Sequence, residues 1–404
     1  FFIFFFLRKQ QGSKMKVMII NTLYYPYKVG GAEVSVRLLA EGLVNLGDQV
    51  TVLSLNNKGS KEDAIYSGVL NSSYPIPNVY WPYDKIHKSR LKKILWHVLD
   101  LFNIKALNIV IKEVKKHKPD IIHTNNLAGW SVSVWLAARM CKCKVVHTSR
   151  DYYLLHPNSS LFRNGQNMDP NRIEVRVLSA FKKYLSRLVT GYVGISSFIK
   201  DLHLTAGFFK KASSARIYNP VVISEHTESN IEKNKHVKSI GFIGRLSEEK
   251  GFDIFCDIAS ANSHRYKFLA AGGFTNSNDK EKFDGSYSDV IRLLGIVELE
   301  DFLKQVDAVI LPVKWNEPFG RVIVECAKAN KFVLTSPKGG ITELNEFFPN
   351  VYLSNDWRKD FKQFDFANAI SESSSCQISF EAKEIASQYR EFYIKVLSSE
   401  VSNL

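Results

Sequence analysis

The stretch "WNEPFGRVIVECAKANKFVLTSPKGGITEL", residues 315–344, combines a turn, a helix and a buried strand. Pro318 and Gly320 mark the start of a helix, and the apolar run "FVLTS" that follows is typical of a buried strand. Two glutamates, Glu317 and Glu325, stand eight positions apart across this turn. A helix that leads directly into a buried apolar strand predicts an α/β sheet of parallel strands.

The same alternation of apolar runs and helical segments extends through both halves of the chain. It predicts two doubly wound, Rossmann-like domains, an α/β fold. Ligands of such sheets bind outside the carboxyl ends of the strands, so we expect the active site in a cleft between two facing domains. The expected strands are 16–21, 49–55, 121–124, 144–148, 192–196 and 215–220 in the first domain, and 239–244, 266–273, 290–295, 308–313 and 332–336 in the second.

The domain boundaries follow from composition. We expect an N-terminal domain over 15–220, a polar linker over 221–238 at the start of a C-terminal domain over 221–384, and a C-terminal helix over 385–404 that packs back across the domains. Because position 1 is not methionine and Met15 directly precedes a strand-like run, we expect 1–14 to be a non-native or wrongly assigned extension. The alternative is a short tail that touches a membrane.

The charge is distributed unevenly. Residues 1–220 carry 32 Lys and Arg against 13 Asp and Glu, a net +19, whereas residues 221–404 carry 22 against 27, a net −5. A basic domain binds nucleic acid, an anionic membrane or an anionic substrate, or simply has a basic soluble surface.

The five cysteines show no C-x-x-C spacing, which favours a reducing cytosol. We expect no membrane-spanning helix.

Two loops between a strand and a helix are candidate anion sites. In "YKVGGAE" (27–33), Gly30 and Gly31 precede a helix, where backbone amides bind anions; the alternative is a purely structural turn. In "GRLSEEKGFD" (244–253), Arg245 and Lys250 can converge on a diphosphate. The alternative is a solvated charged loop.

The turn at 315–320 is the third candidate. Phe319 and Gly320 allow backbone amides to face a ligand, and the positive end of the helix favours an anion. Glu317 and Glu325 are hydrogen-bond acceptors that suit the hydroxyls of a sugar and a ribose. The alternative is a capping Glu317 and a surface Glu325, but Glu325 lies in an apolar run where an unpaired carboxylate is costly to bury.

A fourth candidate, "PDIIHTNN" (119–126), ends a strand with His123 and Asn125 at the sheet edge where α/β enzymes place catalytic groups. A lone histidine there is more often structural. The chain contains no G-x-G-x-x-G, no G-x-x-x-x-G-K-[ST] and no Asp-x-Asp. We therefore expect neither a nicotinamide cofactor nor a catalytic metal, so that Arg, Lys and helix ends must neutralise a diphosphate.

The motifs "GGAE", "GRLSEEKG" and "NEPFGRVIVECAKANKFVLTSPKGGITEL", in this order and spacing, resemble those of the retaining glycosyltransferases of family 4, which have the GT-B fold. The resemblance covers the chain from Met15. It implies a nucleotide-sugar donor, a UDP- or GDP-sugar, held by the C-terminal domain, with the acceptor on the side of the N-terminal domain. No further cofactor is implied.

The resemblance also implies roles for individual residues. Arg245 and Lys250 hold the diphosphate, and Glu317 holds sugar hydroxyls together with the amides of Phe319 and Gly320. Glu325 holds the ribose, and the pocket around Ile296 in "LLGIVE" (293–298) shapes donor specificity. Gly30 and Gly31 approach the diphosphate from the N-terminal domain.

One departure from the family concerns the first domain. Many relatives read H-x-H where this chain has "HTN", so their second histidine, which contacts the transferred sugar, falls on Asn125. Asn can donate to a hydroxyl but cannot titrate. Whether His123 or His147 takes over is open. The segment "HTSRDYYLLHP" (147–157) resembles the acceptor-side loop, which makes His147, Arg150 and Asp151 secondary candidates.

The expected function is therefore transfer of a sugar, by a retaining hexosyltransferase, to a glycan or lipid-linked acceptor in cell-surface polysaccharide or lipopolysaccharide synthesis. We expect a cytoplasmic protein, and an anionic membrane is an expected partner through the basic first domain, with 85–102 as the contact segment. The alternatives are a sugar-nucleotide epimerase, a phosphorylase or a non-enzymatic nucleic-acid or nucleotide-binding protein. The second-domain motifs argue against nucleic acid as a partner.

Overall fold

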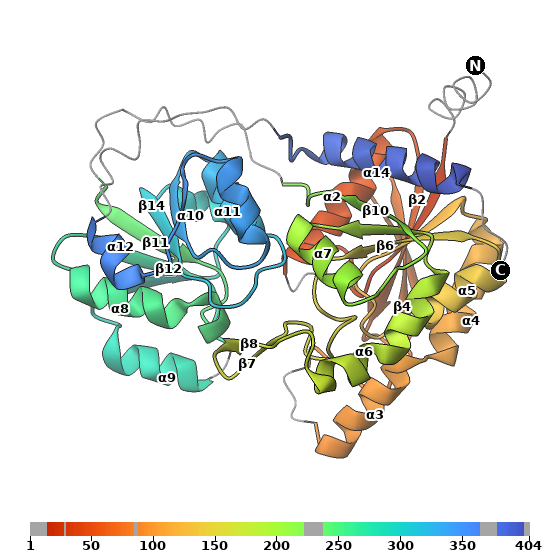
Figure 1. The fold of residues 1–404 in the computed structure, drawn as a ribbon, viewed down its shortest axis with the longest axis horizontal. Helices are drawn as coiled ribbons and strands as arrows, with labels where there is room; N and C mark the ends of the chain where they lie inside the picture. Colours follow the sequence, from red (N-terminus) through yellow and green to blue (C-terminus); the bar gives the residue numbers. More distant parts are fainter. Residues whose placement is uncertain are drawn as a thin grey trace. The chain divides into compact units, whose positions relative to one another are not determined.

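The structure is a computed structural model that describes residues 14–27, 30–84, 88–221, 237–275, 277–363 and 378–399 (Figure 1). It divides into two compact units. The first contains residues 1–161, 169–220 and 380–404, and the second contains 162–168 and 221–379. Most of the expected linker and most of the expected N-terminal extension lie outside the described residues.

The sheet of the first unit is parallel except at one edge. Its order places the first strand, β1, in the interior, next to β2 on one side and β5 on the other, which is the doubly wound arrangement. The edge strand β3 pairs antiparallel with β4, a hairpin that the apolar pattern did not predict. In spatial order the strands are β10 (Ser213–Arg216), β9 (Gly191–Gly194), β6 (Lys144–Ser149), β5 (Ile121–Thr124), β1 (Lys16–Ile20), β2 (Gln49–Asn56), β4 (Val69–Pro75) and β3 (Glu62–Tyr66).

Helices complete the first unit. The last of them, α14, packs against α2, where Gly42 is required because a Cβ there would meet the carbonyl oxygen of Ala382 at 2.8 Å. The half-buried Arg390 of α14 also pairs with the buried carboxylate of Asp48 at 3.1 Å, so this helix is part of the first unit. The helices are α2 (Gly31–Asn45), α3 (Arg90–Leu101), α4 (Ile104–His117), α5 (Ser133–Met140), α6 (Ile173–Leu185), α7 (Ser197–Thr205) and α14 (Ala382–Ser398).

The second unit has a six-stranded, wholly parallel sheet in the strand order of a dinucleotide-binding fold. The hairpin formed by β7 (Phe162–Arg163) and β8 (Gln166–Asn167) belongs to this unit although it lies within the sequence of the first. In spatial order the strands are β13 (Ile291–Gly295), β12 (Lys267–Ala271), β11 (Ser239–Ile243), β14 (Ala308–Leu311), β15 (Phe332–Thr335) and β16 (Val351–Leu353). The helices are α8 (Phe252–Asn262), α9 (Ser277–Ser286), α10 (Leu299–Leu303), α11 (Arg321–Lys328) and α12 (Trp357–Gln363), with short 3₁₀ turns η3 (Glu248–Lys250) and η4 (Gly340–Glu346).

The sequence analysis found no stretch with enough apolar residues to span a membrane, and this point needs correction. The stretch Arg90–His117, which contains α3 and α4, is by length and composition long and apolar enough to cross a membrane, with a mean hydropathy of 1.5 in its most apolar window. A single stretch of this kind is weak evidence for a span. Its second half supplies buried Ala106, Val110 and Val114 to the first unit, so α4 is a core helix of that unit.

Candidate functional site

The point where the strand order reverses is the expected ligand site of each sheet. In the second unit this point lies between β11 and β14. The loop after β11 carries Arg245 and Lys250, and the loop after β14 carries Glu317. The structure therefore brings these three predicted residues to the same edge of one sheet.

Glycine allows these two loops to touch. Gly251 has a φ of +73°, and a Cβ there would lie 1.8 Å from the carbonyl oxygen of Pro312, just after β14. The backbone carbonyl of Glu249 accepts hydrogen bonds from the amides of Lys314 and Trp315 at 3.1 and 3.2 Å. The motif "EEKG" is thus fixed to the segment that leads to Glu317 by backbone contacts.

The side chain of Lys250 pairs with the carboxylate of Glu317. Its ammonium lies 4.9 Å from the ring centroid of Trp315, whose indole N–H donates to Glu317 Oε2 at 2.9 Å. Glu317 is itself anchored by the amide of Gly340, which donates to its carbonyl oxygen at 2.7 Å. A cation, a carboxylate and an indole therefore form one half-buried cluster, in which Trp315 was not predicted from the sequence.

Arg245 lies in the same loop as Lys250 but is more open to solvent. Its side chain is 55% exposed and its guanidinium is 3.3 Å from the carboxylate of Glu249. An exposed surface pair of this kind contributes little to stability, so the guanidinium is available to an anionic ligand. Arg245 therefore lies at the predicted strand end, and it also pairs with Glu249, as the alternative of a solvated charged loop predicts.

Helix α11 begins at Arg321, close to the expected start at Gly320, but Pro318 lies two residues before the N-cap and not just inside the helix as expected. Gly320, with a φ of +93°, is its N-cap, and Phe319 before it is buried. Glu325 is buried in this helix and its carboxylate lies 2.6 Å from the guanidinium of Arg321, one turn earlier. Burial raises the pKa of the Glu325 carboxyl, and the Arg321 guanidinium opposes that rise. The partner that a buried carboxylate needs is therefore present.

Ile296, the residue expected near the donor base, follows β13 at the next strand end. Its side chain is 90% exposed. Its Cδ1 would be 3.7 Å from a Cβ placed on Gly273, which follows β12, so the two residues face each other across adjacent strand ends. An exposed branched side chain beside a glycine is a surface on which a flat ring can lie.

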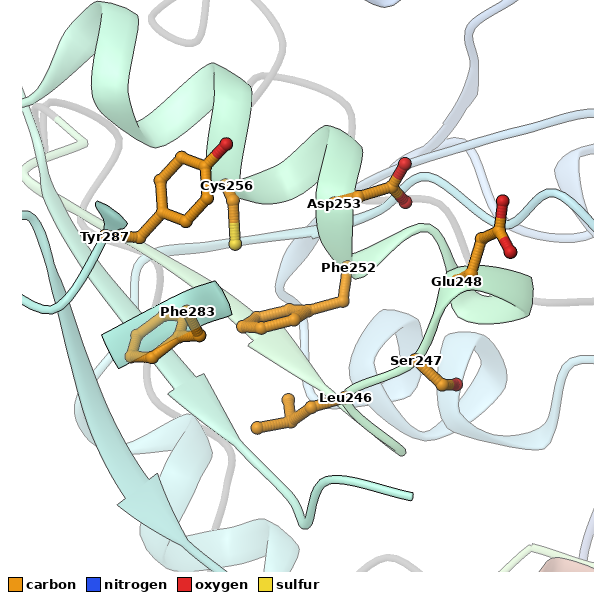
Figure 2. A pocket seen from close by; sticks show the side chains of 8 residues that line it. All are labelled: Leu246, Ser247, Glu248, Phe252, Asp253, Cys256, Phe283 and Tyr287. Atoms are coloured by element: carbon orange, nitrogen blue, oxygen red, sulfur yellow. The ribbon is translucent and has the colours of Figure 1, made fainter. Parts of the chain in front are cut away.

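A cavity of about 320 Å³ opens beside η3 and α8 (Figure 2). Its lower wall is apolar, with the rings of Phe252 and Phe283 stacked at 5.7 Å between centroids. Glu248 and Asp253 lie on one side of the cavity and Tyr287 on the other (Figure 2). The sequence analysis did not predict this cavity.

A second cavity, of about 410 Å³, lies at the carboxyl ends of β14, β15 and β16. The β7–β8 hairpin contributes to it through Asn167, which donates to the carbonyl oxygen of Lys314 at 2.9 Å. Asn167 also accepts the amide hydrogen bond of Asn316 at 2.7 Å. This asparagine, which sequence reasoning missed, fixes the backbone directly before Glu317.

In the first unit, the strand order reverses between β1 and β5, and Asn125 and Asn126 follow β5. Asn125 is buried and its Oδ1 accepts a hydrogen bond from Arg150 Nε at 2.9 Å. The same guanidinium donates to Asn219 Oδ1. Two buried donors, Asn125 Nδ2 and Arg150 Nη2, have no hydrogen-bond partner among the described residues. Each is a donor that the oxygen of a ligand could satisfy.

His123 and His147, either of which was left open as the substitute for the histidine missing at Asn125, are both buried. Both ring nitrogens of His123 are engaged, Nε2 with the Thr148 hydroxyl at 2.8 Å and Nδ1 with the Tyr393 hydroxyl at 2.6 Å. His147 is buried, with Nδ1 2.9 Å from the Thr124 hydroxyl. Burial lowers the pKa of both rings well below the usual value, so they are neutral. Both rings are thus engaged within the first unit, and a role for either in place of the second histidine of many relatives stays a prediction.

Asp151 and Gly30 also have hydrogen-bond partners within the first unit. Asp151 accepts from Asn126 Nδ2 at 3.1 Å and from the Tyr153 amide at 2.8 Å, and burial raises the pKa of its carboxyl to about 6. Gly31 opens α2, and the amide of Gly30 donates to the carboxylate of Glu33 at 2.8 Å. The Glu33 carboxylate therefore occupies the Gly30 amide expected to bind an anion.

Among the described residues, no group of three or more His, Cys, Asp or Glu side chains is arranged to hold a metal ion. The four described cysteines, Cys141, Cys143, Cys256 and Cys326, form no disulfide. The expectation that transfer requires no metal stays a prediction.

The chain resembles known proteins along most of its length. The family model described as Glycosyltransferase Family 4 matches residues 29–225, and the model described as Glycosyl transferases group 1 matches residues 237–363. An uncharacterised 42.6 kDa protein in the cps region of Klebsiella pneumoniae is 44% identical over 382 residues, which is 94% of this chain and 100% of that protein.

Two solved structures share the fold at low identity. The catalytic domain of starch synthase IV from Arabidopsis thaliana, bound to ADP and acarbose, aligns with a TM-score of 0.67 at 15% identity, over 96% of this chain and 100% of that one. HepE from Anabaena, in complex with UDP, aligns with a TM-score of 0.61 at 17% identity, over 95% and 97%. At this identity the likeness concerns the fold, and the neighbours are GT-B glycosyltransferases.

Proposed function

We propose, since the chain belongs to glycosyltransferase family 4, that it transfers a sugar from a UDP- or GDP-sugar to a glycan or lipid-linked acceptor with retention of the anomeric configuration. The cps-region relative supports a role in polysaccharide synthesis at the cell surface. The neighbour that binds UDP supports a nucleotide-sugar donor.

The observation that carries the proposal is the cluster of Lys250, Glu317 and Trp315 at the strand-order reversal of the second unit. A lysine ammonium has three donors, so it can keep one on Glu317 and direct others to a phosphate oxygen. Glu317 is an acceptor for sugar hydroxyls directly beside that phosphate. The arrangement fits a ligand that joins a phosphate to a sugar.

The chemistry of transfer needs a place for negative charge. As the anomeric bond breaks, the diphosphate gains charge, which Lys250 and Arg245 stabilise together with the N-terminus of α11. Glu325 accepts hydrogen bonds from the ribose. In the retaining reaction the acceptor attacks from the side of the leaving group, and a phosphate oxygen takes its proton.

On the first unit, Asn125 and Arg150 supply the polar contacts of the transferred sugar or acceptor. Their unpartnered Nδ2 and Nη2 donate to hydroxyl oxygens. Neither group exchanges a proton at neutral pH, which agrees with a reaction in which a phosphate oxygen, and not a histidine, is the base. By the resemblance to family 4, Asn125 falls where many relatives have a histidine that contacts the transferred sugar.

A thermal-shift panel with UDP, GDP, ADP and their common sugars, with and without magnesium, tests the donor. A ligand that binds the folded state raises the unfolding midpoint. We expect one base to raise it without metal, and Glu325→Gln to abolish the increase. No increase with any nucleotide would contradict the proposal, and a sugar nucleotide that is epimerised without an acceptor would assign the chain to another reaction.

A further inference from the structure

Helix α3 exposes an apolar face that none of the described residues of its own unit covers. Its exposed apolar residues recur every three or four positions, and Leu91 is 79% exposed. The opposite face is fixed: Trp96 is buried and its indole N–H donates to the carbonyl oxygen of Tyr80 at 3.1 Å. The exposed residues of this stripe are Leu91, Ile94, Leu95, Val98 and Phe102.

Helix α6 presents a second stripe of the same kind. Ile173 is 80% exposed, and Val175, Ser179 and Lys182 are buried on the other face. Leaving so many large apolar side chains in water is unfavourable, because each loses the free energy gained by burial. The exposed residues of this stripe are Ile173, Val177, Leu178, Phe181 and Tyr184.

The two stripes are contiguous. The rings of Phe102 and Phe181 meet edge to face, with centroids 6.2 Å apart, and α3 and α6 lie next to each other in Figure 1. A polar cluster holds the helices together from beneath, since the Tyr153 hydroxyl donates to Asp100 Oδ2 at 2.7 Å and the Lys182 ammonium donates to the Tyr153 carbonyl oxygen at 2.7 Å. The combined surface, called here the α3–α6 face, is therefore a fixed feature of the first unit.

The charged residues around this face are almost all basic. Arg90, Lys92 and Lys93 are exposed on α3, and Arg176 is exposed on α6. Both helices are described in full, and Glu174 is their single exposed acidic residue. Basic side chains beside a broad apolar stripe are the composition of a helix that lies in the interface of an anionic bilayer.

We propose that the α3–α6 face docks on an anionic lipid bilayer, with the apolar stripes among the acyl chains and the basic side chains at the headgroups. A second copy of the chain fits less well, because a self-complementary interface would bring the same basic residues together. A nucleic acid would leave ten apolar side chains without a partner. The inference stands independently of the sugar donor.

Co-sedimentation of the full chain with vesicles tests the docking. At low salt, vesicles of phosphatidylcholine and phosphatidylglycerol should bind the chain, and vesicles of phosphatidylcholine alone should bind it much less. The double variant Leu91→Asp and Ile173→Asp should weaken binding at least about tenfold, because two apolar anchors are lost and two negative charges face the lipid.

The matched control is Ile65→Asp with Met140→Asp. These residues are 72% and 61% exposed in the same unit but lie on β3 and α5, and the net charge changes equally. We expect a change of less than about twofold. Each variant must keep the parent unfolding midpoint, and Ile94→Asp with Val177→Asp replaces the first pair if it does not.

Three results would overturn the inference. The first is no binding of the parent to anionic vesicles, and the second is an equal loss in both double variants, which would leave only net charge as the cause. The third is a parent dimer in sedimentation equilibrium that only the α3–α6 variant dissociates, without any effect on vesicle binding. Since no donor is present in these measurements, their failure leaves the proposed transfer untouched.

Discussion

Lys250 and Glu317 form an ion pair although they belong to different strand-to-helix loops, 67 positions apart in the sequence. Trp315 fixes both partners, because its ring lies under the ammonium and its N–H binds the carboxylate. The pair is half-buried, so it is screened less than a surface pair. Its geometry is set before any ligand binds.

We expect Glu317→Gln to lower kcat/KM for transfer by about 10- to 100-fold, because the neutral amide no longer orients the Lys250 ammonium and accepts sugar hydroxyls less strongly. Steady-state kinetics with the donor found in the thermal-shift panel measures it. Glu346→Gln, an exposed glutamate of the same unit, is the matched control and should behave as the parent. Unchanged kinetics in Glu317→Gln would remove Glu317 from the site.

Arg245 should act mainly in the transition state. Its side chain is exposed and only weakly paired, so Arg245→Ala should not affect folding. We expect kcat to fall about 100-fold and the donor Kd to rise less than about tenfold, because charge develops on the diphosphate as the bond breaks.

Single-turnover rates and donor titration separate the two effects of Arg245→Ala. The control is Arg265→Ala, at the amino end of β12 and thus at the opposite edge of the sheet. A loss confined to donor affinity would show that Arg245 only binds.

Glu325 should have two separable roles. Glu325→Gln removes the buried carboxylate charge that faces the Arg321 guanidinium, which costs about 1 to 3 kcal/mol of unfolding free energy. It should also abolish the nucleotide-induced rise of the unfolding midpoint.

Double replacement distinguishes these roles of Glu325. Arg321→Met with Glu325→Gln removes both charges of the pair, so stability should recover in part while nucleotide binding stays lost. Recovery of both would mean that the carboxylate serves only the ion pair.

Part of the second-unit site is predictable from local sequence. The apolar runs of β11, β14 and β15 predict buried strands, and Gly320 predicts a helix start. Parallel strands place their carboxyl ends at one edge, which allows the loops of Lys250 and Glu317 to lie together. That these two residues share one site was implied by the resemblance to family 4, because the residues alone left 244–253 equally readable as a solvated charged loop.

The rest depends on contacts between distant residues. The hairpin that carries Asn167 joins the second unit by bonds to the segment around Lys314, 147 positions away, and no local pattern encodes that choice. His123 stood at the right strand end for a catalytic role, but its partner Tyr393 is 270 positions away on α14. Whether a polar side chain at a strand end is free or engaged is decided by such packing.

Arg150 bridges two asparagines through different nitrogens, Nε to Asn125 and Nη1 to Asn219. Arg150→Lys offers a single point charge and cannot satisfy both acceptors in the buried site. We expect a loss of about 1 to 3 kcal/mol in the unfolding free energy. Urea denaturation measures it, with Arg139→Lys on the exposed end of α5 as the control. Equal stability of both variants would show that the bridge contributes nothing.

His203 should make the first unit sensitive to acid. It is fully buried, its Nδ1 lies 2.9 Å from the Ile199 carbonyl oxygen, and burial lowers its pKa to about 4. An unfolded histidine has a pKa of about 6.5, so below that pH the unfolded chain binds a proton that the folded chain does not. Stability from this group is therefore complete above pH 6.5 and declines as the pH falls toward 4.

Between pH 7 and pH 5 the decline from His203 alone should be about 2 kcal/mol. In His203→Phe, which keeps a ring beside Tyr192 and Phe208, that part of the decline should disappear, while His264→Phe at an exposed position should keep it. Urea unfolding at the two pH values measures the difference. The same decline in His203→Phe as in the parent would mean that other groups, such as the buried rings of His123 and His147, cause the acid sensitivity, because they too bind protons only in the unfolded chain.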